Sequence, residues 1–254
     1  MRRHVLITGA SQGIGRAVAI AFAQRGDQIA VHCGARRDHA EETVALLPGD
    51  GHTLLVGDLS DPEEARRIAD NAERDLGGVD VLVNNAAVAP SAATTHRVAE
   101  VSYPQWQQAW QRMIDVNLLG AANLTYCVAR HLIDRGAPGS IVNVGSRGAF
   151  SGEPDFPAYG ASKAALHAFG QSMAVALAPH RISVTSVAPG FVATERQTDR
   201  LAGSSGAELR GQSPFGRVGT PQEVAAAVLF LASPEATWAS GTVLDLNGAS
   251  YLRT

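Results

Sequence analysis

The chain has 254 residues, of which 45% are hydrophobic and 18% charged, and its formal net charge is -3. This composition is typical of a compact globular protein and too apolar for a disordered one. The charge balance offers no basic excess to attract nucleic acid or a membrane surface, so neither partner is expected. The length suits one large α/β unit, and residues 1–254 are expected to form a single domain.

The N-terminus and the cysteines predict a cytoplasmic protein. The first apolar run, Val5 to Ile7, ends at Thr8 and is far too short for a signal peptide or a membrane span. The two cysteines, Cys33 and Cys127, show neither metal-ligand spacing nor a disulfide framework. The histidines show no such spacing either, so no metal site is predicted.

Short apolar runs rich in β-branched residues alternate along the chain with longer helical patterns. Seven buried strands are predicted, at Val5 to Ile7, Ile29 to Val31, Leu54 to Val56, Val81 to Val83, Ile141 to Val144, Ile182 to Val187 and Val243 to Leu246. Helices are predicted over Ile14 to Arg25, His39 to Leu47, Pro62 to Leu76, Gln105 to Asp134, Ala158 to Ala178 and Pro221 to Ala232. This alternation predicts a Rossmann-type, doubly wound parallel seven-stranded sheet with helices on both faces, which binds ligands at the carboxyl ends of its strands.

The first predicted strand leads into a glycine-rich turn, Thr8-Gly9-Ala10-Ser11-Gln12-Gly13-Ile14-Gly15, and then a helix. Glycines let the backbone turn tightly and approach a pyrophosphate, whose charge then meets the free amides and positive dipole of the helix N-terminus. The order of strand, turn and helix favours a dinucleotide site over a purely structural turn.

The residues after the second predicted strand favour NADP(H) over NAD(H). An acidic side chain there would bind the NAD ribose and repel the 2′-phosphate of NADP, but Cys33 holds that position. Arg36 and Arg37 follow, and an arginine fork can bind phosphate oxygens in pairs. The alternative is that both arginines only cap or solubilise the next helix and that NAD(H) also binds.

Tyr159 and Lys163 lie four residues apart and therefore on one face of a predicted helix. A phenol is a poor acid or base at neutral pH, but an adjacent cation can lower its pKa toward the working range. Lys163 is the only lysine of the chain, which indicates a task that an arginine cannot perform. Ser146, after the fifth strand, is placed to donate to a substrate oxygen. Asn117, in the long helix, is placed to hold a water or brace the backbone beside Lys163.

Together these motifs resemble the short-chain dehydrogenase/reductase family over essentially the whole chain. Thr8, Gly9, Gly13 and Gly15 match its glycine motif, and Asn117, Ser146, Tyr159 and Lys163 match its catalytic tetrad. By this resemblance, the expected cofactor contacts are Gly9, Ser11, Gln12, Gly13, Ile14, Gly15, Arg36, Arg37, Asp58, Leu59, Asn85, Ala86, Ala87, Tyr159, Lys163, Pro189, Gly190, Val192 and Thr194.

The resemblance implies an oxidoreductase that moves a hydride between nicotinamide and a carbonyl or alcohol carbon. In reduction, Tyr159 would give its proton to the carbonyl oxygen and Ser146 would steady that oxygen. Lys163 would bind the ribose hydroxyls of the nicotinamide and, with Asn117 and water, return a proton to Tyr159. The resemblance also implies a homotetramer.

Other activities stay open at this stage. An epimerase or dehydratase of the same fold closes its redox cycle within one substrate, and a dinucleotide sensor binds without chemistry, although its tetrad is expected to be eroded. The chain is most similar to 3-oxoacyl-acyl-carrier-protein reductases. By this resemblance, two basic residues would contact the acidic acyl carrier protein. Arg130 matches one of these positions, but Val175 stands at the other. A small ketone, a sugar or a polyketide is therefore an equally open substrate.

Several residues near these motifs have two interpretations. A segment at about 191–213, with the flexible stretch Ala202 to Gly206, is expected to be a mobile loop that closes over substrate. Arg147 either meets an anionic substrate or pairs with Glu153 or Asp155. The aromatic residues Phe150, Phe156, Tyr103, Trp106 and Trp110 either line the substrate pocket or pack beside it.

Overall fold

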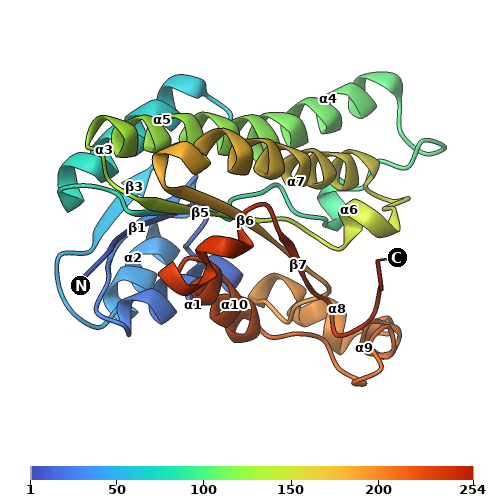
Figure 1. Ribbon diagram of the computed structural model, residues 1–254. Helices are drawn as coiled ribbons and strands as arrows, with labels where there is room; N and C mark the ends of the chain where they lie inside the picture. Colours follow the sequence, from blue (N-terminus) through green and yellow to red (C-terminus); the bar gives the residue numbers. More distant parts are fainter. Residues whose placement is uncertain (1, 254) are drawn as a thin grey trace.

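The computed structural model describes residues 2–253. They form one parallel sheet of seven strands with helices packed against it (Figure 1). The strands are β1 (His4–Ile7), β2 (Gln28–Cys33), β3 (Thr53–Val56), β4 (Val81–Asn84), β5 (Gly139–Val144), β6 (Ile182–Pro189) and β7 (Val243–Leu246). Their order is β3-β2-β1-β4-β5-β6-β7, so the chain reverses its winding direction between β1 and β4. The predicted doubly wound sheet is confirmed, and a ligand crevice is expected at this reversal point.

Helices cover both faces of the sheet (Figure 1). Helices α1 (Gly13–Ala23) and α10 (Pro221–Leu231) pack into one core, and α3 (Pro62–Leu76), α5 (Ala121–Asp134) and α7 (Pro157–Leu177) pack into the other. Alternate strand residues supply the two cores, as the two-residue period of a strand requires: Val5 and Ile7 belong to the first core and Leu6 to the second. The apolar runs of the sequence are therefore buried on both faces.

The remaining elements are shorter or lie at the rim. They are α2 (Arg37–Leu46), η1 (Ala92–Thr94), α4 (Tyr103–Ile114), α6 (Gly148–Ser151), η3 (Ala178–His180), η4 (Glu195–Gln197), α8 (Thr198–Ala202), α9 (Gly206–Gly211) and η5 (Pro234–Ala239). Within residues 2–253, no helix is both long enough and apolar enough to cross a membrane.

The prediction of one continuous helix over Gln105 to Asp134 is wrong, because the structure divides this segment into two α-helices. A π-helical turn, η2 (Asp115–Gly120), separates α4 from α5. In this wider turn Asn117 is buried, and its side chain bonds to Val88 on a neighbouring segment. Such turns break the helical repeat and are frequent at functional sites.

The segment at about 191–213 is more ordered in structure than its composition indicates. It contains η4, α8 and α9, and the glycine- and serine-rich stretch only joins the last two helices. Its mobility stays a prediction.

Close packing between the turn after β1 and the end of β4 constrains Gly15. A β-carbon at this position would lie 2.6 Å from Asn85 Nδ2 and 2.8 Å from the α-carbon of Ala10, and it would collide with the carbonyl oxygen of Gly9. Helix α1 can approach the strands this closely only without a side chain here.

We therefore expect Gly15→Ala to lower the free energy of unfolding by about 1–3 kcal/mol, the usual cost of overpacking a tight site. The measurement is equilibrium urea unfolding. Gly211→Ala is the matched control, since a β-carbon at Gly211 would meet no atom within 4 Å. Equal stability of the two variants would contradict the expected constraint.

Candidate active site

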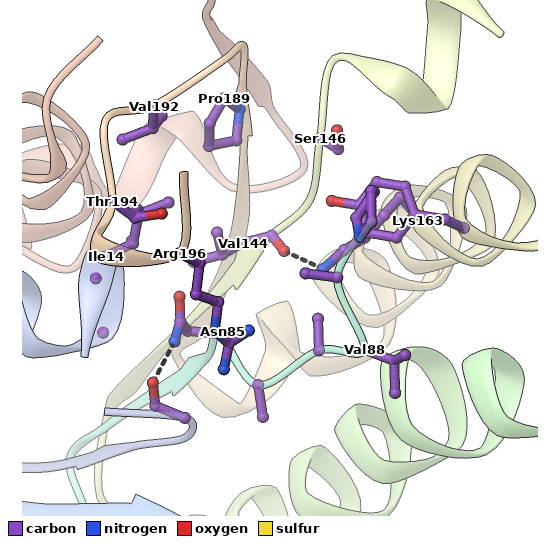
Figure 2. A pocket seen from close by; sticks show the side chains of 18 of the residues that line it. Ile14, Asn85, Val88, Val144, Ser146, Lys163, Pro189, Val192, Thr194 and Arg196 are labelled. Atoms are coloured by element: carbon purple, nitrogen blue, oxygen red, sulfur yellow. Dashed lines mark hydrogen bonds between the residues drawn. The ribbon is translucent and has the colours of Figure 1, made fainter. Parts of the chain in front are cut away.

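A cavity of about 690 Å³ opens at the carboxyl ends of the strands, on both sides of the reversal point between β1 and β4. Figure 2 shows side chains from the turn after β1, from the ends of β4, β5 and β6, and from α7 around it. Of the residues predicted to bind or react, only Arg37 and Asn117 do not line it. The cavity therefore gathers motifs that lie far apart in the sequence.

The glycine-rich turn forms one wall of the cavity and is braced by the end of β4. Gly9 and Gly13 adopt positive φ angles of 63° and 57°, which other residues rarely adopt. The Thr8 hydroxyl oxygen accepts hydrogen bonds from the backbone amides of Asn85 and Ala86, both at 2.9 Å. Asn85 Nδ2 in turn donates to the carbonyl oxygen of Gly9 at 3.0 Å.

Helix α1 begins at this turn and has no acidic residue in its first turn. The Gly13 amide donates to a carboxylate oxygen of Glu195 at 2.9 Å, so an anion already lies at this helix N-terminus. Gln12 Nε2 lines the same wall, is buried and has no hydrogen-bond partner in the described residues. A free buried donor, a positive helix end and a turn that has glycine at positions 9, 13 and 15 fit the pyrophosphate of a dinucleotide.

The two arginines after β2 point in different directions. Arg36 lines the cavity, and its Nη1 donates to Gln12 Oε1 at 3.1 Å. Arg37 is the first residue of α2 and pairs with Glu41 one turn later at 2.8 Å, on the exposed side of that helix. The structure therefore brings Arg36 to the site but not Arg37. Arg36 is the last residue before α2, whereas Arg37 already belongs to the helix and points to its exposed side.

Arg196, from η4, also lines the cavity, and the sequence analysis did not identify it (Figure 2). Partial burial and the neighbouring Arg36 guanidinium lower the pKa of Arg196. Two like charges facing one space favour an anion between them. A signal was present, since Arg196 follows the predicted contact Thr194 by two residues.

At the far end of the cavity, Leu59 is buried and Asp58 is exposed. Asp58 accepts hydrogen bonds from the Ser60 amide and from Arg112, each at 3.0 Å. Burial acts to raise the pKa of Asp58, but these hydrogen bonds outweigh it and the pKa is lowered. The carboxylate is therefore an anionic acceptor at neutral pH.

Ser146, Tyr159 and Lys163 meet at the opposite end. Ser146 lies two residues after the end of β5, and its hydroxyl oxygen accepts from the Gly148 amide at 3.0 Å. Lys163 Nζ lies 5.9 Å from the ring centre of Tyr159 and donates to the carbonyl oxygen of Val144 at 2.8 Å (Figure 2). This bond joins α7 to the end of β5 and fixes the ammonium beside the phenol.

Burial dominates the protonation of both groups. It raises the pKa of Tyr159 to about 12, against a hydrogen bond from Ser146 that lowers it, and the Glu153 carboxylate raises it further. Burial also lowers the pKa of Lys163 from 10.5 to about 8. In the protein without cofactor, desolvation penalises both charged forms and keeps the pKa of the phenol high. That Lys163 lowers the pKa of Tyr159 toward neutral pH stays a prediction.

Asn117 lies behind the cavity wall and is 1% exposed. Its Oδ1 accepts from the Val88 amide at 2.7 Å, and its Nδ2 donates to the Ser162 hydroxyl at 3.0 Å. Of the two roles considered for this side chain, the geometry is that of a brace, which ties the segment after β4 to helix α7.

Some of the neighbouring residues for which the sequence left two interpretations line the cavity, and others pack beside it. Phe156 lines the cavity, whereas Phe150 stacks on His167 with ring centres 5.3 Å apart. Arg147 lines the cavity and donates to Ser250 at 2.9 Å, so it pairs with neither of the two acidic residues considered for it.

The aromatic residues of α4 lie outside the cavity lining. Trp106 packs against His96 and Trp110, with ring centres 5.9 Å and 5.7 Å apart, and Tyr103 is 72% exposed. Besides Arg147 and Arg196, four charged residues that are not among the predicted contacts line the cavity: Arg112, Glu153, Asp155 and Arg200.

Comparisons with known proteins agree with this geometry. The family model described as Enoyl-(Acyl carrier protein) reductase matches residues 9–248. Similar proteins include the L-rhamnose 1-dehydrogenase (NAD(P)(+)) of Sphingomonas sp. (strain SKA58), 36% identical over 98% of this chain and 96% of that protein. A 3-oxoacyl-[acyl-carrier-protein] reductase of Vibrio cholerae is 32% identical, over 97% and 96% of the two chains.

Solved structures extend the likeness to the whole fold. A short chain dehydrogenase from Burkholderia cenocepacia in complex with NADP superposes with a TM-score of 0.86 at 28% identity, covering 98% of this chain and 97% of that one. A 3-ketoacyl-(acyl-carrier-protein) reductase from Brucella melitensis, complexed with NADH, has the same TM-score and identity and covers 98% of both chains. The chain therefore belongs to the short-chain dehydrogenase/reductase family of NAD(P)-dependent oxidoreductases.

Proposed function

We propose that this protein is an NADP(H)-dependent oxidoreductase that interconverts a ketone and a secondary alcohol. The observation that carries the proposal is the arrangement of one cavity: Ser146, Tyr159 and Lys163 converge at one end, and the glycine-rich turn after β1 forms one wall. The bound nicotinamide supplies or accepts the hydride. The predicted cofactor contacts other than Arg37 would hold the dinucleotide, with its pyrophosphate at the N-terminus of α1.

The residues of this chain manage the proton and the substrate oxygen. The Ser146 hydroxyl donates a hydrogen bond to that oxygen as negative charge develops on it. Tyr159 gives its proton to the oxygen in reduction and removes it in oxidation. Lys163 supplies positive charge beside the phenol, and Asn117 keeps α7 in place through Ser162. The cofactor's own positive charge, in its oxidised form, acts in the same direction on the phenol.

Preference for NADP(H) rests on Arg36 and Arg196. Both line the cavity, and neither forms an ion pair with an acidic residue in the described chain. The last residue of β2 is Cys33 and not an acidic residue, whose carboxylate would repel a 2′-phosphate. The descriptions of similar proteins include both NADP and NADH, so the similarity by itself does not favour either cofactor. The proposed preference for NADP(H) therefore depends on these residues of the cavity.

The proposal also covers the domain organisation, the cellular location and the oligomeric state of the protein. Residues 1–254 act as one catalytic domain, and the segment at about 191–213 closes over the substrate. The protein works in the cytoplasm as a homotetramer. Large exposed apolar side chains, among them Tyr126 on α5, Val175 on α7 and Trp238 on η5, support association between copies.

Replacing Tyr159 by Phe tests the chemistry. We expect kcat to fall by about 10²–10⁴-fold, the usual share of general acid–base catalysis, while NADPH binds with a similar Kd. NADPH absorbance with a panel of ketones measures the first quantity, and fluorescence titration measures the second. Wild-type protein without turnover, or turnover that survives the substitution unchanged, would overturn the proposal.

Arg36 and its neighbour Arg37 form a matched pair for cofactor choice. Loss of a charge-assisted contact to phosphate costs about 1.5–3 kcal/mol, so Arg36→Gln is expected to raise the KM for NADPH by roughly 10- to 100-fold. The KM for NADH should stay within about threefold on the same scale. Arg37→Gln removes the same charge but should change neither constant, since Arg37 lies outside the cavity. Equal effects of the two variants would refute the assignment.

Burial of Lys163 predicts a pH-dependent stability. Since its folded pKa, about 8, lies below 10.5, the unfolded chain binds more protons between these values and stability rises with pH in that window. Wild type should gain about 2 kcal/mol relative to Lys163→Met between pH 7 and pH 9.5. Urea unfolding at both pH values measures the difference, and a parallel pH dependence of the two proteins would count against a desolvated ammonium.

A further inference from the structure

Glu153 occupies the substrate end of the cavity without a partner of its own. It lies on the connection between α6 and α7 and lines the same wall as Ser146 and Tyr159. Its side chain is half-buried, yet no hydrogen bond or ion pair from residues 2–253 reaches its carboxylate. Asp155, two residues later, is satisfied by two hydrogen bonds from Arg97, at 2.7 Å and 3.0 Å.

Two glycines make room for the Glu153 side chain. A β-carbon at Gly148 would collide with Glu153 Oε1, and one at Gly160 would lie 3.5 Å from the β-carbon of Glu153. Both glycines touch the catalytic residues, because the Gly148 amide bonds to Ser146 and Gly160 directly follows Tyr159. The carboxylate is thus packed into the site rather than free on the surface.

Charges around Glu153 agree with a polar ligand. Burial raises the pKa of Glu153, while Arg147 and Arg200 lower it without forming an ion pair with it. Arg200 lies over the ring of Phe191, 5.4 Å from its centre, and Arg147 donates to Ser250. The unpaired Glu153 carboxylate and the two planar guanidinium groups therefore line the same cavity as the phenol. Asp155 lines it too and adds to the raised pKa of Glu153, but Arg97 already pairs with its carboxylate.

We propose that Glu153 is a specificity-determining residue whose carboxylate accepts a hydrogen bond from a substrate hydroxyl close to the reacting carbon. The substrate class is a polyhydroxylated carbonyl compound or the matching polyol, which is neutral and carries donors for Glu153 and acceptors for Arg147 and Arg200. This inference rests on the proposed ketone–alcohol chemistry and deepens it.

Other substrate classes satisfy the carboxylate less well. An apolar chain would cover Glu153 without offering a donor, and a half-buried polar group left unpaired costs free energy. An anionic substrate would suit Arg147 and Arg200 but would meet the repulsion of Glu153. A site built around a substrate hydroxyl strongly rejects the analogue that lacks it, and this supplies the test.

The first experiment compares substrates that differ only in hydroxyl groups. Wild type, Glu153→Gln and Glu235→Gln are assayed with NADPH on 1-hydroxy-2-butanone and 2-butanone, and with NADP⁺ on L-rhamnose, D-xylose and xylitol. Glu235, on η5, is the control because it is exposed, lies outside the cavity lining and outside the segment at about 191–213, and forms no ion pair in the described chain.

Wild type and Glu235→Gln should prefer the hydroxylated ketone by at least about tenfold in kcat/KM, the value of one charge-assisted hydrogen bond. Glu153→Gln should reduce this ratio to within about threefold. Equal turnover of both ketones by wild type would overturn the inference and leave the proposed function intact. Failure of wild type to turn over any carbonyl or alcohol would overturn both.

The second experiment separates a direct electrostatic role from a structural one. Glu153 raises the pKa of Tyr159, so its neutralisation should move the pH profile of alcohol oxidation toward lower pH. Glu235→Gln should leave the profile in place. A lower rate for Glu153→Gln at every pH, without a displaced profile and with an unchanged substrate ratio, would show a packing role only and refute the proposal.

Discussion

The hydrogen bond from Lys163 Nζ to the carbonyl oxygen of Val144 joins helix α7 to the end of strand β5. It satisfies an ammonium that is only 2% exposed, in a position where an unpaired charge would be costly. It also places the cation next to Tyr159 and at the end of β5, two residues before Ser146. The reacting groups are therefore held by the junction of a helix and a strand rather than by a flexible loop.

This placement has a thermodynamic cost that explains the protonation states. Desolvation raises the pKa of Tyr159 to about 12 and lowers that of Lys163 to about 8, so the protein by itself disfavours both charged forms. In the proposed mechanism, the positive charge of an oxidised nicotinamide would favour the phenolate and so assist alcohol oxidation. Stability and function consequently oppose each other at Lys163, as is common at active sites.

Charge divides the cavity into regions with different tasks. Arg36 and Arg196 face the end that would hold the ribose phosphate, and Arg147 and Arg200 face Glu153 at the reacting end. Two of these arginines, Arg196 and Arg200, come from the segment at about 191–213. That segment therefore contributes to both regions, and Glu195 within it already contacts the amide of Gly13. A movement of this segment would alter cofactor and substrate binding together.

The sequence by itself determined the seven strands, the glycine turn and the identity of the groups that meet at the reacting end. These features depend on local patterns: buried strands leave apolar runs, a tight turn before a helix needs glycine, and Tyr159 and Lys163 share a helix face at a spacing of four. Tertiary structure alone decided that Arg36 enters the cavity while Arg37 leaves it, that Asn117 sits on a π-helical turn, and that Arg196 and Glu153 face the site. The reason is that the direction of a side chain at a helix start or on a connection depends on what packs against it, and those partners, such as Gly148 for Glu153, belong to segments that meet only when the chain is folded.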